Sequence, residues 1–550
     1  MTTATATATP ATGRGSGALT GTATLLRFML RRDRIRLPAW LIGISIFVPY
    51  CFAQLRTAFP TEADLATASG FTSGPMLALF GGPGYGMQGE DLSYVTFFAG
   101  IYAMYLMLAA AVMNILFVSR HTRVEEQTGR AELVRANVVG RHAALAATTI
   151  LAMASNLVLS VLILAALRAS DAPLAGSAAV AAGIGLFGMV FAGVSMTAVQ
   201  ISEYSAAASG LAGGILGGAF VIRAAGDMIG EHGSALSWIT PFAWSQQTRA
   251  FVDERWWPLA ISLVVCAALV TTGFALSTRR DLGAGLRATR RGRTGARAWL
   301  RSPLMLAWRL HRGSVRGWAV GLILGGVVYG TTTQTVVDSF ADMTSEFTQI
   351  LSTAGGSLLM GYLNMMIVIM VITTAVFEFL AVLKVRSEET GGRAEPVLAT
   401  AVGKKTWLGA HLLVISAAAL VLLVASCAAM GFTAAVGTGD WSLLGKLTVA
   451  GLVYSPALLL IAALAATCYG LHPRLLGLAA AVLVFSGLAA VFGELLNLPE
   501  AVMAISPWHH TPAYPVESVT AAPLIVQAAV FAALAGLGLG AFARRDLASV

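Results

Sequence analysis

Long stretches of apolar residues recur along this chain, separated by short polar segments. Each stretch comes close to the roughly 20 residues that an α-helix needs to cross the hydrocarbon layer of a membrane. The pattern therefore predicts about twelve membrane-spanning helices in two sets of six. The first set is expected at residues 38–55, 94–118, 143–167, 174–200, 206–226 and 258–277. The second set is expected at residues 317–337, 359–383, 407–430, 446–470, 475–496 and 523–543.

Composition agrees with this pattern. Of the 550 residues, 57% are hydrophobic and 11% are charged, which is too apolar for a soluble protein. We therefore expect an all-α integral membrane protein. The four cysteines lie inside predicted spans without CxxC spacing, so neither a disulfide framework nor a metal motif is indicated. His509 and His510 have no cysteine or carboxylate at ligand spacing, and no metal site is expected there.

The basic residues are unevenly distributed between alternate loops. If the N-terminus is cytoplasmic, the outer side holds only six of the 36 lysines and arginines: Arg56, Arg168, Arg223, Arg249, Arg255 and Lys446. Basic residues concentrate on the cytoplasmic side of multi-pass proteins. The net charge of +9 therefore reflects topology, and no nucleic-acid binding is expected. We expect a multi-pass protein of a bacterial cytoplasmic membrane, with both termini in the cytoplasm.

A ten-residue pattern, R-x-E-E-x-x-G-R-A-E, occurs twice in the chain. It runs from Arg123 to Glu132 and again from Arg386 to Glu395. The residues after the sixth and twelfth spans also match, because Arg-Arg-Asp-Leu occurs at residues 279–282 and again at 544–547. Six spans are an even number, so both copies enter the membrane from the same side. The chain is thus expected to contain two parallel six-helix repeats.

This repeat predicts four segments. Residues 1–24 are expected to form a disordered cytoplasmic tail, and residues 25–282 the first six-helix half. Residues 283–302 are expected to form a basic cytoplasmic linker, followed by the second half at residues 303–550. The first outer loop contains a glycine-rich run at residues 81–86, which is either an outer cap or an ordinary irregular loop.

Each copy of the repeated pattern leads into a short helical segment, expected at residues 131–139 and 394–402. Gly140 and Gly403 follow these segments and are expected to end them in a left-handed conformation. One interpretation is a solvated, charged loop that reverses the chain. The other is a docking element for a cytoplasmic partner. The pattern recurs at the corresponding position in both halves, with glycine, arginine and glutamate at the same places in each copy. This recurrence favours the docking interpretation.

These residues resemble the coupling-helix region of type-2 ABC exporter permeases. The fused twelve-span layout is similar to actinobacterial permeases of polyketide-antibiotic or multidrug exporters, over about residues 25–550. The usual form of the coupling region ends in a Thr-Pro-like step. This chain has Asn137-Val138 and Thr400-Ala401 instead, which departs from that pattern.

The resemblance implies a permease that is driven by a separate cytoplasmic ABC ATPase. Two copies of this ATPase would bind Mg-ATP beneath each permease chain, and the exported substrates would be drugs or polyketide-type antibiotics. The residues that would form or brace the ATPase contacts are Glu125, Glu126, Gly129, Arg130, Glu132, Glu388, Glu389, Gly392, Arg393 and Glu395. The chain contains no G-x-x-x-x-G-K-[ST] phosphate loop. We therefore expect neither catalytic residues nor a cofactor in this chain.

Candidates for a substrate path or its gate lie within the spans: Gly210, Gly214, Gly218, Arg223, Asp227 and Glu378. The glycines permit either static close packing or a sliding helix interface. Arg223 and Asp227 are spaced to pair on one helix face. These two residues and Glu378 are near enough to span ends for snorkelling, although charges within a bilayer are costly and often functional.

Two other function classes remain as alternatives. A proton-coupled secondary multidrug transporter with two six-helix halves would need titratable residues at mid-membrane, and these are nearly absent from the predicted spans. A membrane enzyme acting on lipid substrates would need polar residues that converge near one interface, and no such cluster stands out. The sequence therefore favours the permease subunit of an ATP-driven efflux pump for hydrophobic or amphipathic compounds.

Overall fold

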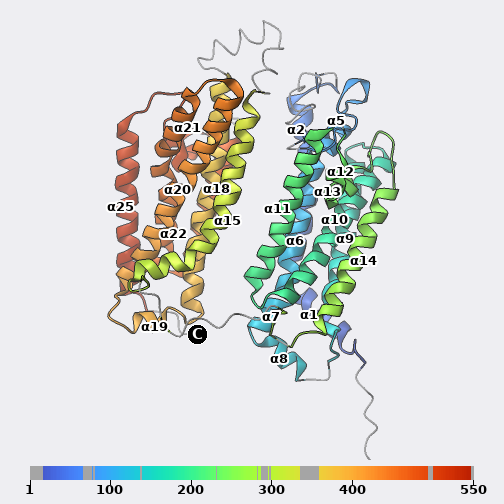
Figure 1. Ribbon diagram of the computed structural model, residues 1–550, viewed down its shortest axis with the longest axis horizontal. Helices are drawn as coiled ribbons and strands as arrows, with labels where there is room; N and C mark the ends of the chain where they lie inside the picture. Colours follow the sequence, from blue (N-terminus) through green and yellow to red (C-terminus); the bar gives the residue numbers. More distant parts are fainter. Residues whose placement is uncertain are drawn as a thin grey trace, which may run out of the picture. The chain divides into compact units, whose positions relative to one another are not determined.

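The computed structural model is all-helical in the part of the chain that it describes. That part comprises residues 17–62, 64–65, 77–78, 81–136, 139–230, 232–281, 283–286, 295, 299–334, 358–492 and 499–546. Eleven of the described helices are long and apolar enough to cross a membrane. The prediction of an all-α, multi-pass membrane protein is confirmed. The chain divides into two compact units, residues 1–292 and 293–550, which Figure 1 shows as two helical bundles.

The first unit contains six long helices and several short ones. The long helices are α2 (Arg36–Ala58), α6 (Ala103–His121), α9 (Ala143–Ala169), α10 (Leu174–Ile201), α11 (Ser205–Ile229) and α14 (Trp257–Ser277). The short helices are α1 (Thr22–Arg32), η2 (Gly89–Asp91), α5 (Tyr94–Phe97), η3 (Phe98–Tyr102), α7 (Arg123–Gln127), α8 (Arg130–Arg135), α12 (Ala235–Trp238) and α13 (Pro241–Gln246). Figure 1 shows α1, α7 and α8 at one end of this unit, called here its elbow end.

Helix α10 forms the centre of the first unit because small residues let its neighbours approach closely. It packs against α6, α9 and α14, and a side chain at Gly188 would collide with the amides of Asn156 and Asn114. These two asparagines, on α9 and α6, donate to each other at 3.0 and 2.9 Å. The pair satisfies polar groups that would otherwise be costly to bury in the core.

The second unit is built from helices at corresponding positions in the repeat. Its elements are α15 (Pro303–Thr331), α18 (Leu358–Thr390), α19 (Glu395–Leu398), α20 (Lys404–Thr438), α21 (Ser442–Val453), α22 (Ser455–Leu471), η4 (Pro473–Leu475), α23 (Leu476–Phe492), α24 (Glu500–Met503), η5 (Pro507–His510) and α25 (Ala521–Arg544). Figure 1 shows α19 at one end of this unit, its elbow end. Helix α15 lies along α20, and α25 lies along α22.

The helix that leads into the first span differs between the two units. In the first unit, α1 ends at Arg32 and α2 begins at Arg36, with Asp33 buried between them and bonded to His121 at 2.6 Å. In the second unit, α15 is one helix of 29 residues. It covers the predicted seventh span as far as the structure describes it. Three arginines lie in the first half of α15, which is not among the eleven apolar helices.

Candidate functional site

Each unit carries a charged turn that follows its second predicted span. The first elbow comprises residues 123–136, with α7 and α8 on either side of Gly129. The second elbow comprises residues 386–399, in which α18 ends before Gly392 and α19 follows it. Gly129 has a φ of 72° and Gly392 a φ of 68°. A side chain disfavours this left-handed region by about 1–2 kcal/mol, which accounts for glycine at both turns.

The prediction that Gly140 and Gly403 are left-handed helix stops is wrong. Gly403 has a φ of −68°, and Gly140 is not among the residues with positive φ. Gly140 instead allows a close backbone approach, because a Cβ there would lie 2.4 Å from the carbonyl of Ala18. Its amide donates to Thr20 at 2.9 Å. Residues 17–20 therefore pack against Gly140, after the first elbow, whereas residues 1–16 of the expected tail lie outside the described part.

Glu126 in the first elbow is tied to the residues that follow the sixth span. Its two carboxylate oxygens accept from the Arg280 guanidinium at 2.7 and 2.9 Å. Arg123 donates to the same carboxylate at 2.7 Å. Glu126 is 10% exposed and Arg280 8%, so the ion pair is largely removed from solvent. A bidentate arginine–carboxylate contact of this kind fixes both position and orientation.

Arg123 is a fully buried anchor beneath this pair. Its Nε donates to the carbonyl of Val199 near the end of α10 at 2.9 Å, and its Nη1 donates to Ala284 at 3.0 Å. Burial lowers the guanidinium's hydration, and these carbonyls together with Glu126 replace it. The first elbow is therefore bonded to the ends of both α10 and α14.

The second elbow repeats this arrangement. Glu389 is 2% exposed and accepts from Arg545, just after α25, at 2.7 and 2.9 Å. Tyr469 of α22 also donates to this carboxylate. The Arg545 guanidinium lies over the rings of Tyr469 and Phe542, 5.0 and 5.2 Å from their centroids. Such cation–π contacts add to the ion pair.

The same two residue types therefore join the second and sixth spans of each unit. We call Glu126–Arg280 the first clamp and Glu389–Arg545 the second clamp. The sequence displayed the acidic pattern and the terminal Arg-Arg-Asp-Leu as separate repeats, and their pairing was not predicted. The sequence did contain a signal for this pairing. Both motifs recur at almost the same offset, and each lies at the end of a span on the predicted cytoplasmic side.

The neighbouring glutamates, Glu125 and Glu388, form ion pairs that are separate from the clamps. Glu125 pairs with Arg32 of α1, and Arg130 lies 3.8 Å from the same carboxylate. Glu388 accepts from Arg393 at 2.8 and 3.1 Å. The Glu388 carboxylate raises the pKa of Arg393. The Glu388–Arg393 pair lies within the second elbow, whereas the Glu125–Arg32 pair joins the first elbow to α1.

The surface of each elbow is formed by the residues beyond the left-handed glycine. On the first elbow, Arg130 and Glu132 are exposed, and Leu133 is 72% exposed. On the second elbow, Arg393 and Glu395 are exposed, while the following apolar residues of α19 pack on the core of the unit. Of the ten predicted coupling residues, these four charged side chains are therefore presented outward, whereas Glu126 and Glu389 face inward.

The glycines of α11 border open space within the first unit. A Cβ added at Gly210, Gly214 or Gly218 would meet no atom within 4 Å. Static close packing and a sliding helix interface both remain predictions for these glycines. The structure leaves this face of α11 uncovered by the described residues of the first unit.

Arg223 and Asp227 form the predicted pair, 3.3 Å apart. Their side chains are 0% and 2% exposed, so neither reaches the surface of the unit. Arg223 also donates to the carbonyls of Ala78 and Gly81 at 2.8 and 2.9 Å, and Ser237 donates to Asp227 at 2.6 Å. The pair thus anchors the first outer loop onto α11.

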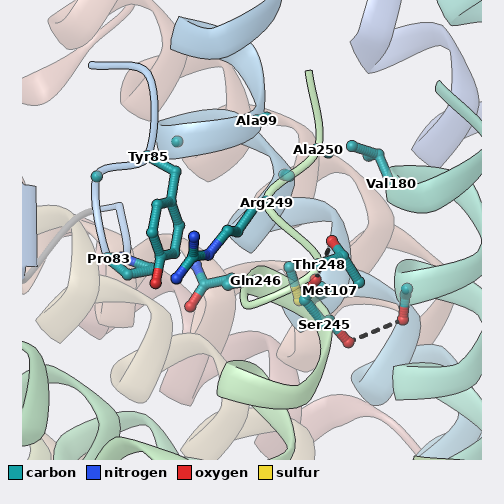
Figure 2. Close-up of a pocket in the computed structure, with 14 residues that line it drawn as sticks. Pro83, Tyr85, Ala99, Met107, Val180, Ser245, Gln246, Thr248, Arg249 and Ala250 are labelled. Atoms are coloured by element: carbon teal, nitrogen blue, oxygen red, sulfur yellow. Dashed lines mark hydrogen bonds between the residues drawn. The ribbon is translucent and has the colours of Figure 1, made fainter. Parts of the chain in front are cut away.

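The glycine-rich outer loop closes over a small cavity of about 40 Å³. Figure 2 shows Tyr85 and Arg249 side by side at this cavity, with Gln246 beside them. The Arg249 guanidinium lies 4.6 Å from the Tyr85 ring centroid, and Gln246 donates to Gly81 at 3.0 Å. A cavity of this size holds a few waters at most, so it is too small for a drug-sized molecule.

Glu378 lies in the interior of the second unit on α18. Its side chain is fully buried and does not reach the surface of the unit. Neither carboxylate oxygen forms a hydrogen bond with a described residue. The backbone of Ala462 on α22 is a polar neighbour of this carboxyl group. Glu378 is therefore a carboxylate within a predicted span that is enclosed by protein.

The fold and the two elbows define a multi-pass membrane protein with a duplicated charged turn. Comparison with known proteins adds its class. Residues 23–276 and 300–543 match the family model described as multidrug efflux system permease Rv1217c, C-terminal domain. The chain is 37% identical over 542 residues to the multidrug efflux system permease protein Rv1217c of Mycobacterium tuberculosis, covering 97% of this chain and 96% of that protein. The chain belongs to this family of multidrug efflux permeases.

Proposed function

We propose that this chain is the membrane subunit of an ATP-driven ABC exporter for hydrophobic or amphipathic compounds such as drugs or polyketide-type antibiotics. A separate cytoplasmic ATPase, in two copies, binds Mg-ATP and docks on the two elbows. Both termini and both elbows lie on the cytoplasmic side of a bacterial inner membrane in this proposal. The relative from Mycobacterium tuberculosis, named as a permease of an efflux system, supports a partner-driven transporter.

The observation that carries the proposal is the duplicated clamp behind an exposed short helix. In each unit the elbow surface is exposed, while a buried carboxylate directly behind it is bonded to the arginine that follows the sixth span of that unit. A force applied to α8 or α19 would pass through the clamp of that unit to a membrane span. Lone surface ion pairs transmit little because they are weak and solvated, whereas these pairs are largely buried.

One specific observation favours a second candidate, a proton-coupled secondary transporter. Glu378 is fully buried without a hydrogen-bond partner among the described residues. A carboxyl group that can take up and release a proton inside the membrane is what that class requires. The elbows would then be structural turns only.

Reconstitution separates the two functions. The permease is placed in liposomes with and without the ATPase encoded beside it, and export of a fluorescent amphipathic dye is followed with ATP or with a proton gradient. We expect transport only with the ATPase and ATP, and stimulation of ATP hydrolysis by the dye. Transport driven by a proton gradient in the absence of the ATPase would overturn the ABC proposal and favour the second candidate.

A further inference from the structure

A groove between α2 and α6 in the first unit carries an inference about ligand chemistry. It has a volume of about 520 Å³, within the range of sites for drug-sized molecules. Its lining residues are Arg36, Ala39, Trp40, Gly43, Ile44, Phe47, Tyr105, Leu106 and Ala109. Helix α2 packs mainly against α9 rather than α6, which leaves this space open.

The lining follows from the spacing of residues along α2. Arg36, Trp40, Gly43 and Phe47 recur every three or four residues and therefore share one helix face. From Arg36 to Phe47 this face is about 16 Å long at 1.5 Å per residue, roughly half the hydrocarbon thickness. Gly43 borders the open space of the groove, since a Cβ there would meet nothing within 4 Å.

The groove is polar at one end and apolar along the rest. Arg36 lies at the end of α2 nearest the elbow, is exposed, and makes no ion pair with a described residue. The nearby carboxylate of Asp33 is buried and already held by His121 and Arg120. The mouth therefore presents positive charge without a carboxylate of its own to neutralise it. Aromatic side chains of Trp40, Phe47 and Tyr105 line the rest.

The second unit does not repeat this groove in its sequence. At the offset of 280 residues that aligns Arg36 with Arg316, Ile323 stands where Gly43 is and Val320 where Trp40 is. A branched side chain in place of Gly43 would fill the space. The groove is therefore a specific feature of the first half, and Arg316 provides a matched control for Arg36.

We propose that this groove binds an anionic amphiphile as a transported compound, with its acidic group at Arg36 and its apolar part between α2 and α6. The proposal rests on the function proposed above and narrows its substrate class. A carboxylate or sulfonate would form a charge-assisted hydrogen bond with the guanidinium, and the apolar part would replace lipid along the aromatic lining. In the proposed topology the ligand enters from the inner leaflet.

Protection from chemical labelling tests the site directly. A Gly43→Cys variant in phosphatidylcholine nanodiscs is labelled with N-ethylmaleimide, and the wild-type chain serves as the blank because its four cysteines are buried. Oleate, oleyl alcohol and oleylamine share one chain and differ in the head group. We expect oleate to protect Cys at position 43 at about a tenfold lower concentration than the other two, given the strength of charge-assisted bonds. Adding Arg36→Gln should remove this preference, whereas Arg316→Gln should keep it.

Several outcomes would overturn the proposal. One is equal protection by the three probes, and a second is protection by oleate that persists in the Arg36→Gln variant. A third is that Cys at position 43 is not labelled even without a probe, because another part of the chain covers it. Protection by phosphatidylglycerol in the nanodisc equal to that by oleate would identify a lipid site and also overturn it.

A second measurement connects the groove to transport. In the complex with the ATPase, Gly43→Leu should abolish stimulation of ATP hydrolysis by oleate and keep stimulation by a neutral dye. Unchanged stimulation by oleate would contradict the proposal. The labelling assay needs neither ATP nor a partner, so it tests ligand binding in the groove independently of the ABC function. If the ABC function itself is wrong, no compound will be exported in an ATP-dependent manner.

Discussion

Glu389 and Arg545, 156 residues apart, form an ion pair between the second elbow and the residue just after α25, in which Nη2 of Arg545 lies 2.7 and 2.9 Å from the two carboxylate oxygens. Glu126 and Arg280 form the corresponding ion pair in the first unit, where two guanidinium nitrogens each donate to one carboxylate oxygen at 2.9 and 2.7 Å. Each pair joins an exposed elbow to the end of a membrane span. Two copies of one contact in a duplicated chain make it the best-defined element of the proposed coupling site.

Breaking the second clamp should destabilise the second unit. Arg545→Met leaves the Glu389 carboxylate, only 2% exposed, without its guanidinium partner. Removing one member of a buried ion pair costs about 3–5 kcal/mol. We therefore expect a clearly lower unfolding temperature in detergent. The adjacent, exposed Arg544→Met is the control and should change little. Equal effects of the two variants would show that the clamp contributes nothing specific.

Removing both members of the clamp should cost less than removing one. In the double variant Glu389→Gln with Arg545→Met, the buried carboxylate that makes the single variant costly is gone. Replacing a whole buried pair is often close to neutral. Unfolding measured across all four proteins of this cycle gives the coupling energy. A coupling energy near zero would be incompatible with the contact as described.

The exposed charges of the elbows should affect coupling without affecting stability. Glu132→Lys combined with Glu395→Lys reverses two charges that project outward from α8 and α19. We expect weaker binding of the ATPase, about tenfold if each site loses roughly 0.7 kcal/mol, in the range of exposed pairs. The unfolding temperature should not change. Glu500→Lys on α24 is the matched exposed control. Wild-type affinity of the double variant would remove these residues from the docking surface.

The left-handed glycines should resist substitution. Gly392→Ala places a Cβ on a residue with a φ of 68°, which costs about 1–2 kcal/mol. Open space surrounds the position, so the cost is conformational rather than steric. Gly313→Ala, inside α15 and also in open space, should instead be neutral or stabilise the helix by up to about 1 kcal/mol. Chemical unfolding of both variants compares them, and a stabilising Gly392→Ala would contradict the described turn.

Glu378 should tolerate loss of its charge in the fold. Glu378→Gln breaks no ion pair and no side-chain hydrogen bond with a described residue, so it should leave the unfolding temperature within a few degrees of wild type. Glu378→Lys places an uncompensated ammonium at the same buried position and should prevent stable folding. ATP-driven export by Glu378→Gln then reports on function. Loss of export with normal stability and normal ATPase binding would favour the proton-coupled candidate.

The sequence by itself determined the architecture of the membrane-embedded part. Runs of about 20 apolar residues are a local property, and lipid leaves the backbone no alternative to helices within them. Helices cover every predicted span as far as the described residues reach. The duplicated acidic pattern also located both elbows, because identical charges and glycines at two matching positions stand out from an apolar chain.

Only the tertiary structure decided what each charged residue contacts. The partners Glu126 and Arg280 are 154 residues apart, and no local pattern states how closely the ends of α6 and α14 approach. The same holds for Glu378 and Arg223, whose nearness to a span end suggested snorkelling, whereas neighbouring helices and the outer loop enclose them. Hydrophobicity along the chain gives the depth of a residue in the membrane, but burial depends on which helices pack around it, and that is a property of the folded bundle.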